Sequence, residues 1–149
     1  MREILFICEH NSARSQMAAA YLNLHAAGRL HAESAGLEPG VLNPYVVEVL
    51  AEEGIDISRM KTQSVFELYK NERRFDAVIT VCSPDVREKC PIFPGRVLRL
   101  NWPFDDPSQL AGSREEIIAQ TRIIRDRIKE KVLSFIHEYD EKGLKLFIE

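Results

Sequence analysis

The chain has 149 residues, of which 45% are hydrophobic and 29% are charged, and its formal net charge is −3. This length and composition are typical of one soluble globular domain with its own core. The slightly acidic balance gives no indication of a nucleic-acid partner or an anionic membrane surface, and no apolar stretch approaches the ~20 residues that cross a bilayer.

The first predicted elements are a strand, a helix and a second strand. Residues 3–7 form a short apolar run, and residues 15–27 follow with a helical pattern that stops near Gly28. Residues 31–34 read as the second strand. Asn43 then precedes Pro44, an N-cap residue before a proline in the first turn, which predicts a helix that ends near Gly54.

The second half of the chain continues the alternation. A short helix is predicted after Ser64, with Phe66 in the core, and strands are predicted at residues 77–81 and 96–100. Ser113 and Glu116 form a capping box that opens a long helix. Its apolar stripe is expected at residues 117, 121, 124, 128, 132 and 135, and the charged run 122–131 is expected on the solvated face.

Alternating strands and helices with short connections predict an α/β fold with a parallel sheet covered on both sides. Such sheets bind ligands at the carboxyl ends of their strands, near the point where the strand order reverses. Cys8 follows the first predicted strand and Cys82 follows the third. The sequence therefore predicts a site at this edge of the sheet.

The segment from Cys8 to Ser15 joins the first strand to the first helix. A strand that turns directly into a helix N-terminus aims several backbone N–H groups at one spot, which favours an anion. Cys8 would lie beneath that anion as a thiolate nucleophile, because a helix N-terminus promotes thiol ionisation. Arg14 would supply a planar fork for two oxygens, and Ser15 would donate its hydroxyl to the thiolate.

The three cysteines, Cys8, Cys82 and Cys90, do not form a structural disulfide set or a zinc site. Their number is odd, and their spacings lack the close pairs that zinc sites use. The start of the chain leads directly into an apolar run too short for a signal peptide. We therefore expect a cytoplasmic protein with reduced thiols, no metal and no cofactor.

The stretch from Cys8 to Ala18, CEHNSARSQMA, resembles the phosphate-binding loop of low-molecular-weight tyrosine phosphatases and of the related thioredoxin-coupled arsenate reductases. Four further segments agree in order and spacing: 34–36, 54–58, 81–82 and 102–107. The resemblance covers residues 1–140 as one domain and leaves 141–149 as a C-terminal tail. It implies a three-layer α/β/α sandwich on a four-stranded parallel sheet of order 2-1-3-4.

The resemblance also implies roles for individual residues. The oxyanion would bind to the loop residues Glu9, His10, Asn11, Ser12, Ala13 and Arg14. Asn11 would hold the loop in its unusual backbone shape, since asparagine tolerates a positive φ better than most residues. Asp106, directly before Pro107, would be the general acid that protonates the leaving oxygen, whereas Asp105 reads as a turn carboxylate.

In the reductase branch, the two later cysteines would complete a redox relay. Cys82 would attack Cys8, and Cys90 would then attack Cys82, so that thioredoxin or another thiol reductant is the implied partner. The interval from Cys82 to Cys90 is one residue longer than the usual form, and the segment between them is expected to reorganise. Ala13 and Ala19 stand where some relatives have a second loop cysteine and a glutamate that supports potassium, so no cation is predicted.

Three functions remain open at this point. The first is arsenate reduction through the three cysteines. The second is a low-molecular-weight tyrosine phosphatase acting through a phosphocysteine, although Ser108-Gln109-Leu110 supplies no aromatic residue to grip a substrate ring. The third is an oxyanion-binding module without catalysis, which leaves Asp106 and the two later cysteines unexplained.

Overall fold

A four-stranded parallel sheet forms the centre of the molecule. The computed structural model describes residues 1–83 and 88–147. The strands are β1 (Arg2–Cys8), β2 (Leu30–Gly36), β3 (Ala77–Thr80) and β4 (Leu98–Asn101). Their order is β2-β1-β3-β4, which confirms the predicted topology.

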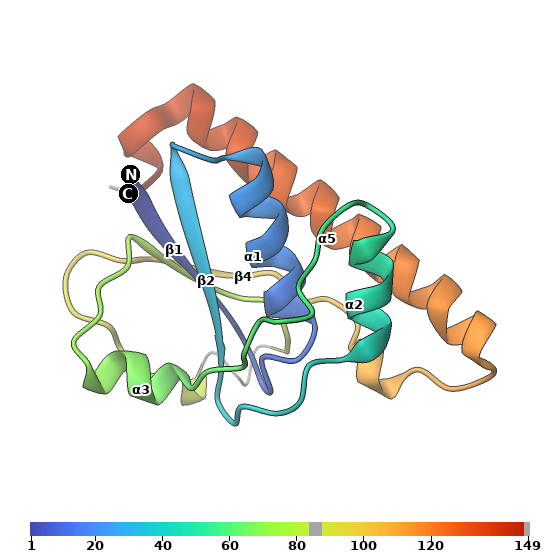
Figure 1. Cartoon of the computed structure of the whole chain (residues 1–149). Helices are drawn as coiled ribbons and strands as arrows, with labels where there is room; N and C mark the ends of the chain where they lie inside the picture. The colour runs from blue at the N-terminus through green and yellow to red at the C-terminus, as the bar shows by residue number, and fades with distance from the viewer. Residues whose placement is uncertain (84–87, 148–149) are drawn as a thin grey trace.

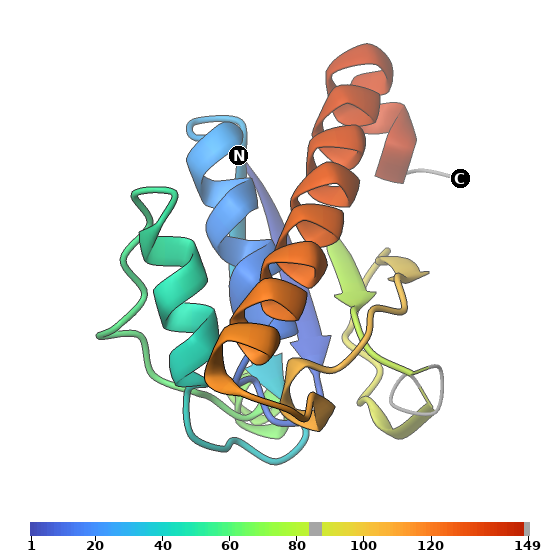
Figure 2. The ribbon, with the colours of Figure 1, turned by 90° about the vertical axis from the view of Figure 1, so that its right-hand side faces the viewer.

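The sheet is built around β1, which pairs with β2 on one side and β3 on the other. Residues 4–8 of this strand are all buried, as expected for a strand covered on both faces. Ile7 lies opposite Ala35 of β2 and Thr80 of β3. All strands run in the same direction, so their carboxyl ends meet at one edge of the sheet (Figure 2).

Helices cover both faces of the sheet and make the predicted three layers. Three of them, α1 (Arg14–His25), α2 (Pro44–Ala51) and α5 (Arg114–Lys142), lie together on one side of the sheet, as Figures 1 and 2 show. The short helix α3 (Val65–Lys70) lies on the other side (Figure 1). Two 3₁₀ turns complete the described elements: η1 (Pro107–Gln109) and η2 (Gly143–Phe147).

The starts of the helices follow from their sequences, with one exception. Asn43, Ser64 and Ser113 each accept backbone hydrogen bonds at the first turns of α2, α3 and α5, and Ser113 forms the predicted capping box with Glu116. Helix α1 instead starts after Ala13, which has no side-chain acceptor. The first-turn amides of α1 are therefore left for another partner.

The long helix α5 differs from the sequence prediction in two ways. Its buried stripe starts at Ile118, because Ile117 is half-buried. Arg125, assigned by its charge to the solvated face, is 9% exposed and lies among α2 residues. The helix runs to Lys142, and η2 folds back so that the rings of Tyr139 and Phe147 are 5.6 Å apart.

The prediction that Phe66 lies in the core is wrong. Phe66 is 46% exposed on the outer side of α3, whereas Val65 and Leu68 of the same helix are buried against the sheet. The helix has six residues, too few for a hydrophobic pattern to identify which face is covered.

Candidate active site

The residues between β1 and α1, here called the anion loop (residues 8–14), lie at the edge where the strands end. Their carbonyl groups are held from outside by residues 37–43, which follow β2 and which we call the strap (Figure 1). Four strap N–H groups donate to loop carbonyls: Leu37 to Cys8 (3.3 Å), Glu38 to Glu9 (2.8 Å), Gly40 to His10 (2.9 Å) and Asn43 to Ser12 (2.9 Å).

This pairing determines where the loop amides point. In a trans peptide the N–H group lies opposite the C=O group, so carbonyls that face the strap turn the following N–H groups inward. The N–H of Asn11 follows this direction and donates to Cys8 Sγ at 3.2 Å. Inward amides and the uncapped start of α1 are the features that anion sites use, so this region above Cys8 is a candidate anion site.

Gly36 allows the loop to pass close to the end of β2. A Cβ atom at this position would lie 2.7 Å from the backbone nitrogen of Asn11, closer than real Cβ contacts. Gly36 belongs to the matching segment 34–36 but has no predicted role. An Ala-Gly pair at the end of a predicted strand is the local signal for such a close approach.

The predicted nucleophile lies in a small hydrogen-bond network. Cys8 Sγ is 2.9 Å from Ser15 Oγ, and the side-chain nitrogen of Asn11 donates to the same hydroxyl oxygen at 2.8 Å. Because Ser15 accepts from Asn11, its own hydrogen is available to Cys8. Asn11 has φ of 55°, the left-handed conformation expected for it.

Arg14 and Asp106 meet at the mouth of the loop. The Arg14 side chain is 10% exposed, its Nη1 donates to the Phe104 carbonyl at 2.9 Å, and its Nη2 lies 3.6 Å from Asp106 Oδ2. The other oxygen of Asp106 accepts from the N–H and hydroxyl of Ser108 at 2.9 and 2.8 Å. The neighbouring carboxylate, Asp105, is 79% exposed and points to Arg127 of α5.

Cys82 lies directly beside the loop, as predicted from the strand order. Burial and the neighbouring Cys8 raise the pKa of the Cys82 thiol to about 12, whereas Arg14 and the N–H of Glu9 act in the opposite direction. The thiol is therefore protonated at neutral pH in this reduced state.

Cys90 is half-buried and belongs to the segment that leads to β4. Burial raises the pKa of its thiol to about 11, and its Sγ faces the Pro91 carbonyl at 3.5 Å. The predicted reorganisation of the interval from Cys82 to Cys90 falls largely on residues 84–87, which lie outside the described residues.

The remaining predicted binding residues contribute their backbones. Glu9 and His10 have exposed side chains on the rim, Ser12 is half-buried, and Ala13 is buried. His10 Nδ1 lies 3.2 Å from the Glu38 carbonyl of the strap, so this side chain turns away from the loop centre.

Within residues 1–83 and 88–147, no group of three or more His, Cys, Asp or Glu side chains has the arrangement to hold a metal ion. In the same part of the chain, no helix is both long and apolar enough to span a bilayer.

The chain is similar to several arsenate reductases. The arsenate reductase of Bacillus licheniformis is 38% identical over 135 residues, which cover 90% of this chain and 94% of that protein. A solved structure of an arsenate reductase in the phosphate binding state superposes with a TM-score of 0.71 at 28% identity, covering 93% of this chain and 98% of the other. The thioredoxin-dependent arsenate reductase of Corynebacterium glutamicum is 30% identical with a TM-score of 0.60, covering 89% of this chain and 62% of the other.

A family model provides the broader assignment. The model for low molecular weight phosphotyrosine protein phosphatase matches residues 3–145. This range includes the anion loop, the whole of α5 and all of the described strand residues except Arg2 of β1. The chain therefore belongs to the low molecular weight phosphotyrosine protein phosphatase family.

Proposed function

We propose that this protein reduces arsenate to arsenite with Cys8 as the nucleophile. The observation that carries the proposal is the position of Cys8 Sγ, which accepts a hydrogen bond from the Asn11 N–H and lies 2.9 Å from the Ser15 hydroxyl. The sulfur lies beneath the anion loop, and the buried Arg14 is at the mouth of that loop, where it donates to the Phe104 carbonyl. Relatives that bear the name arsenate reductase, one of them 38% identical, support the choice of oxyanion.

In the first step, the Cys8 thiolate attacks the arsenic atom, and a hydroxide leaves. Asp106, in its protonated form, gives that hydroxide a proton, so water departs and a Cys8–arsenic(V) adduct forms. The amides of residues 9–14 and the Arg14 guanidinium hold the charged oxygens throughout. Arg14 lies 3.6 Å from Asp106, which puts the acid at the rim where the leaving oxygen would point.

Reduction follows when Cys82 attacks Cys8 Sγ as a thiolate, its proton passing to an oxygen of the departing arsenite. The electron pair of the sulfur–arsenic bond passes to arsenic, so arsenite leaves and a Cys8–Cys82 disulfide forms. Cys90 then loses its proton to solvent and attacks Cys82 Sγ, which releases the Cys8 thiolate and leaves a Cys82–Cys90 disulfide. A dithiol reductant restores both thiols, and we propose thioredoxin, because one relative is named thioredoxin-dependent. A reducing cytoplasm is the compartment that suits this cycle.

A phosphatase acting through a phosphocysteine is the second candidate. The family match favours it, since the same loop and acid suffice for phosphate ester hydrolysis. Ser108, Gln109 and Leu110, which follow Pro107, provide no aromatic ring to bind a tyrosyl substrate. A module that binds oxyanions without catalysis accounts for the loop but gives Asp106 no role.

The two later cysteines distinguish these functions. We expect Cys82→Ser and Cys90→Ser each to lose multiple-turnover arsenate reduction with thioredoxin, thioredoxin reductase and NADPH, measured as NADPH oxidation. Both variants should keep hydrolysis of a small aryl phosphate, which needs Cys8, Arg14 and Asp106 alone.

Cys8→Ser is the matched control, because it should lose both activities. After a single arsenate addition to the wild type, mass mapping should find a Cys82–Cys90 disulfide. Full reductase turnover in both serine variants would remove the relay and leave the phosphatase as the better candidate.

A further inference from the structure

Gln16 is a buried polar residue in the first turn of α1 that belongs to the quoted motif but has no predicted role. It is 2% exposed, and its amide nitrogen Nε2 lies 3.2 Å from the backbone carbonyl of Asn11 and 3.3 Å from Asn11 Oδ1. An amide nitrogen is a donor only, so Gln16 donates to Asn11 at both positions.

These contacts fix the orientation of the Asn11 side chain. Its Oδ1 also accepts from the backbone N–H of Gln63 at 3.0 Å. With two donors on the oxygen, the Nδ2 group must face Ser15 Oγ, which it reaches at 2.8 Å. Ser15 then accepts from Asn11 and directs its own hydrogen to Cys8 Sγ, 2.9 Å away.

We propose that Gln16 is a positioning residue, which acts through Asn11 and Ser15 to stabilise the thiolate form of Cys8. It does not touch the oxyanion site itself. Its donation to both the backbone and the side chain of Asn11 couples the left-handed loop conformation to the direction of the Ser15 hydroxyl. The inference rests on the proposed function only in treating Cys8 as the nucleophile.

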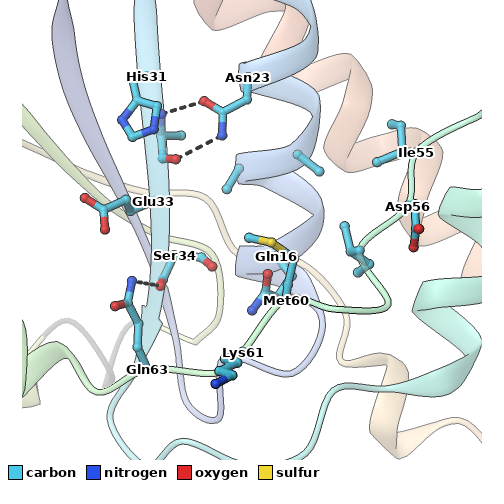
Figure 3. A pocket seen from close by; sticks show the side chains of 14 residues that line it. Gln16, Asn23, His31, Glu33, Ser34, Ile55, Asp56, Met60, Lys61 and Gln63 are labelled. Atoms are coloured by element: carbon cyan, nitrogen blue, oxygen red, sulfur yellow. Dashed lines mark hydrogen bonds between the residues drawn. The ribbon is translucent and has the colours of Figure 1, made fainter.

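The surroundings of Gln16 provide a matched control. Gln16 and Gln63 both line a cavity of about 430 Å³ between α1, β2 and the segment before α3 (Figure 3). The Gln63 side chain donates to the Ser34 carbonyl at 2.8 Å, whereas Gln63 reaches Asn11 through its backbone N–H. Gln63→Met therefore removes a side-chain hydrogen bond from the same cavity and leaves the network to Cys8 complete.

Methionine is the appropriate replacement at both positions. It has nearly the length of glutamine and no N–H donor, so it fills the space without donating to Asn11. Alanine would enlarge a cavity that is already lined in part by the small residues Ala19, Ala20 and Ala32. A water molecule that entered this space would donate hydrogen bonds to Asn11 in place of Gln16.

Neither substitution changes the charged or titratable groups near Cys8. Cys82, which lies beside Cys8, Glu9 and Arg14, is unchanged, and so is Asp106, which pairs with Arg14. A change in the ionisation of Cys8 would therefore be due to the hydrogen-bond network rather than to an altered neighbouring charge.

The test measures alkylation of Cys8 by iodoacetamide from pH 5 to 9, with the modified residue identified by peptide mass. Iodoacetamide reacts with the thiolate, and the measurement needs no arsenate, so it stays valid even if the protein reduces no arsenate. Gln16→Met should slow Cys8 alkylation at pH 6 by about three- to tenfold and move the pH profile upward. Gln63→Met should stay within about twofold of the wild type.

A double-mutant cycle separates the network from a general effect on the loop. In a Ser15→Ala background, Gln16→Met should change the alkylation rate by less than about twofold, because the connection to Cys8 is already broken. If Gln16→Met does not fold, Gln16→Asn, which keeps the amide on a shorter side chain, should give the same slowing. Unchanged alkylation, equal slowing in the Gln63 variant, or an undiminished Gln16 effect without Ser15 would overturn the proposal.

Discussion

At the residue scale, two adjacent carboxylates have different environments. Asp106 lies 3.6 Å from Arg14 and is 28% exposed, whereas Asp105 is 79% exposed and 3.7 Å from Arg127. Only a carboxyl group at the mouth of the anion loop can give a proton to a leaving oxygen, because proton transfer needs hydrogen-bond distance.

Replacement of Asp106 with Asn should slow the chemical step by about 10²–10⁴-fold and leave anion affinity nearly unchanged, since the amide cannot supply the proton. Single-turnover kinetics with arsenate and, separately, with an aryl phosphate measure this step. Asp105→Asn is the control and should be close to wild type. A larger loss in the Asp105 variant would move the acid to that position.

A second residue-scale prediction concerns alkaline pH. The pKa of Cys82 is raised to about 12 in the folded protein, above the usual value of ~8.5 for an unfolded thiol. As the pH rises, the unfolded chain therefore loses this proton before the folded protein does. The contribution of the protonated Cys82 thiol to the free energy of unfolding is complete below about pH 8.5 and declines as the pH rises toward 12. Urea unfolding between pH 8 and 11 should give a shallower fall in the free energy of unfolding for Cys82→Ser than for the wild type.

Local patterns predicted some site residues and missed others for a physical reason. Cys8, Arg14 and Ser15 follow one another on a strand, a loop and a helix start, so their proximity is encoded by a short stretch of sequence. Gln63 is brought to Asn11 by the tertiary fold, because the two residues are 52 positions apart in the chain, and no local spacing identifies such a contact. Gln16 is only five positions from Asn11, but a polar residue in the first turn of a helix gives no sign in the sequence that its side chain is buried.

At the element scale, the capped helices and the apolar strands were predictable, but one face of α5 was not. The charge of Arg125 predicted that its side chain would face solvent. Its Nη1 instead donates to the Val49 carbonyl and to Glu52 Oε1, both at 2.9 Å. Hydrophobic periodicity cannot recognise a buried arginine whose partners come from another helix. Polar contacts from Arg125 to α2 and to the residue that follows it therefore hold a part of α5 that the pattern assigned to solvent.

This junction supports a stability prediction. Arg125→Met should reduce the free energy of unfolding by about 2–3 kcal/mol, because it leaves the Val49 carbonyl and the Glu52 carboxylate without their buried donor. Arg122→Met is the matched control: Arg122 also binds Glu52, at 2.7 Å, but its side chain is 46% exposed. Urea denaturation should show little change for the control, and equal losses would contradict the assignment of Arg125 as the buried partner.

At the scale of the whole molecule, the strand order is the feature that sequence alternation left undetermined. Alternating strands and helices predict a parallel sheet, but its order came from the family resemblance and is confirmed as β2-β1-β3-β4. This order makes β1 and β3 neighbours and brings Cys82 beside the anion loop. A sheet in sequential order would have separated these two strands.

An oxyanion that binds this loop should stabilise the whole fold. We expect phosphate to bind the folded state and not the unfolded chain, so a concentration of 100 Kd should add about 2.7 kcal/mol to the free energy of unfolding. Thermal unfolding in increasing phosphate should show a rising Tm for the wild type and for Cys8→Ser, which keeps the loop amides and Arg14. Arg14→Ala should lose most of the rise, and an identical rise in that variant would contradict binding at this loop.

The central position of β1 also has a consequence for protein synthesis. Cys8 leaves the ribosome before β3, with which its strand pairs through contacts such as Ile4 with Ala77, and before Phe104, whose carbonyl holds Arg14. These contacts join residues far apart in sequence, so they cannot form until the later segments have been made. During translation Cys8 therefore lies on an incomplete sheet, and the surroundings that we propose activate it are complete only after the segment that carries Asp106 has been made.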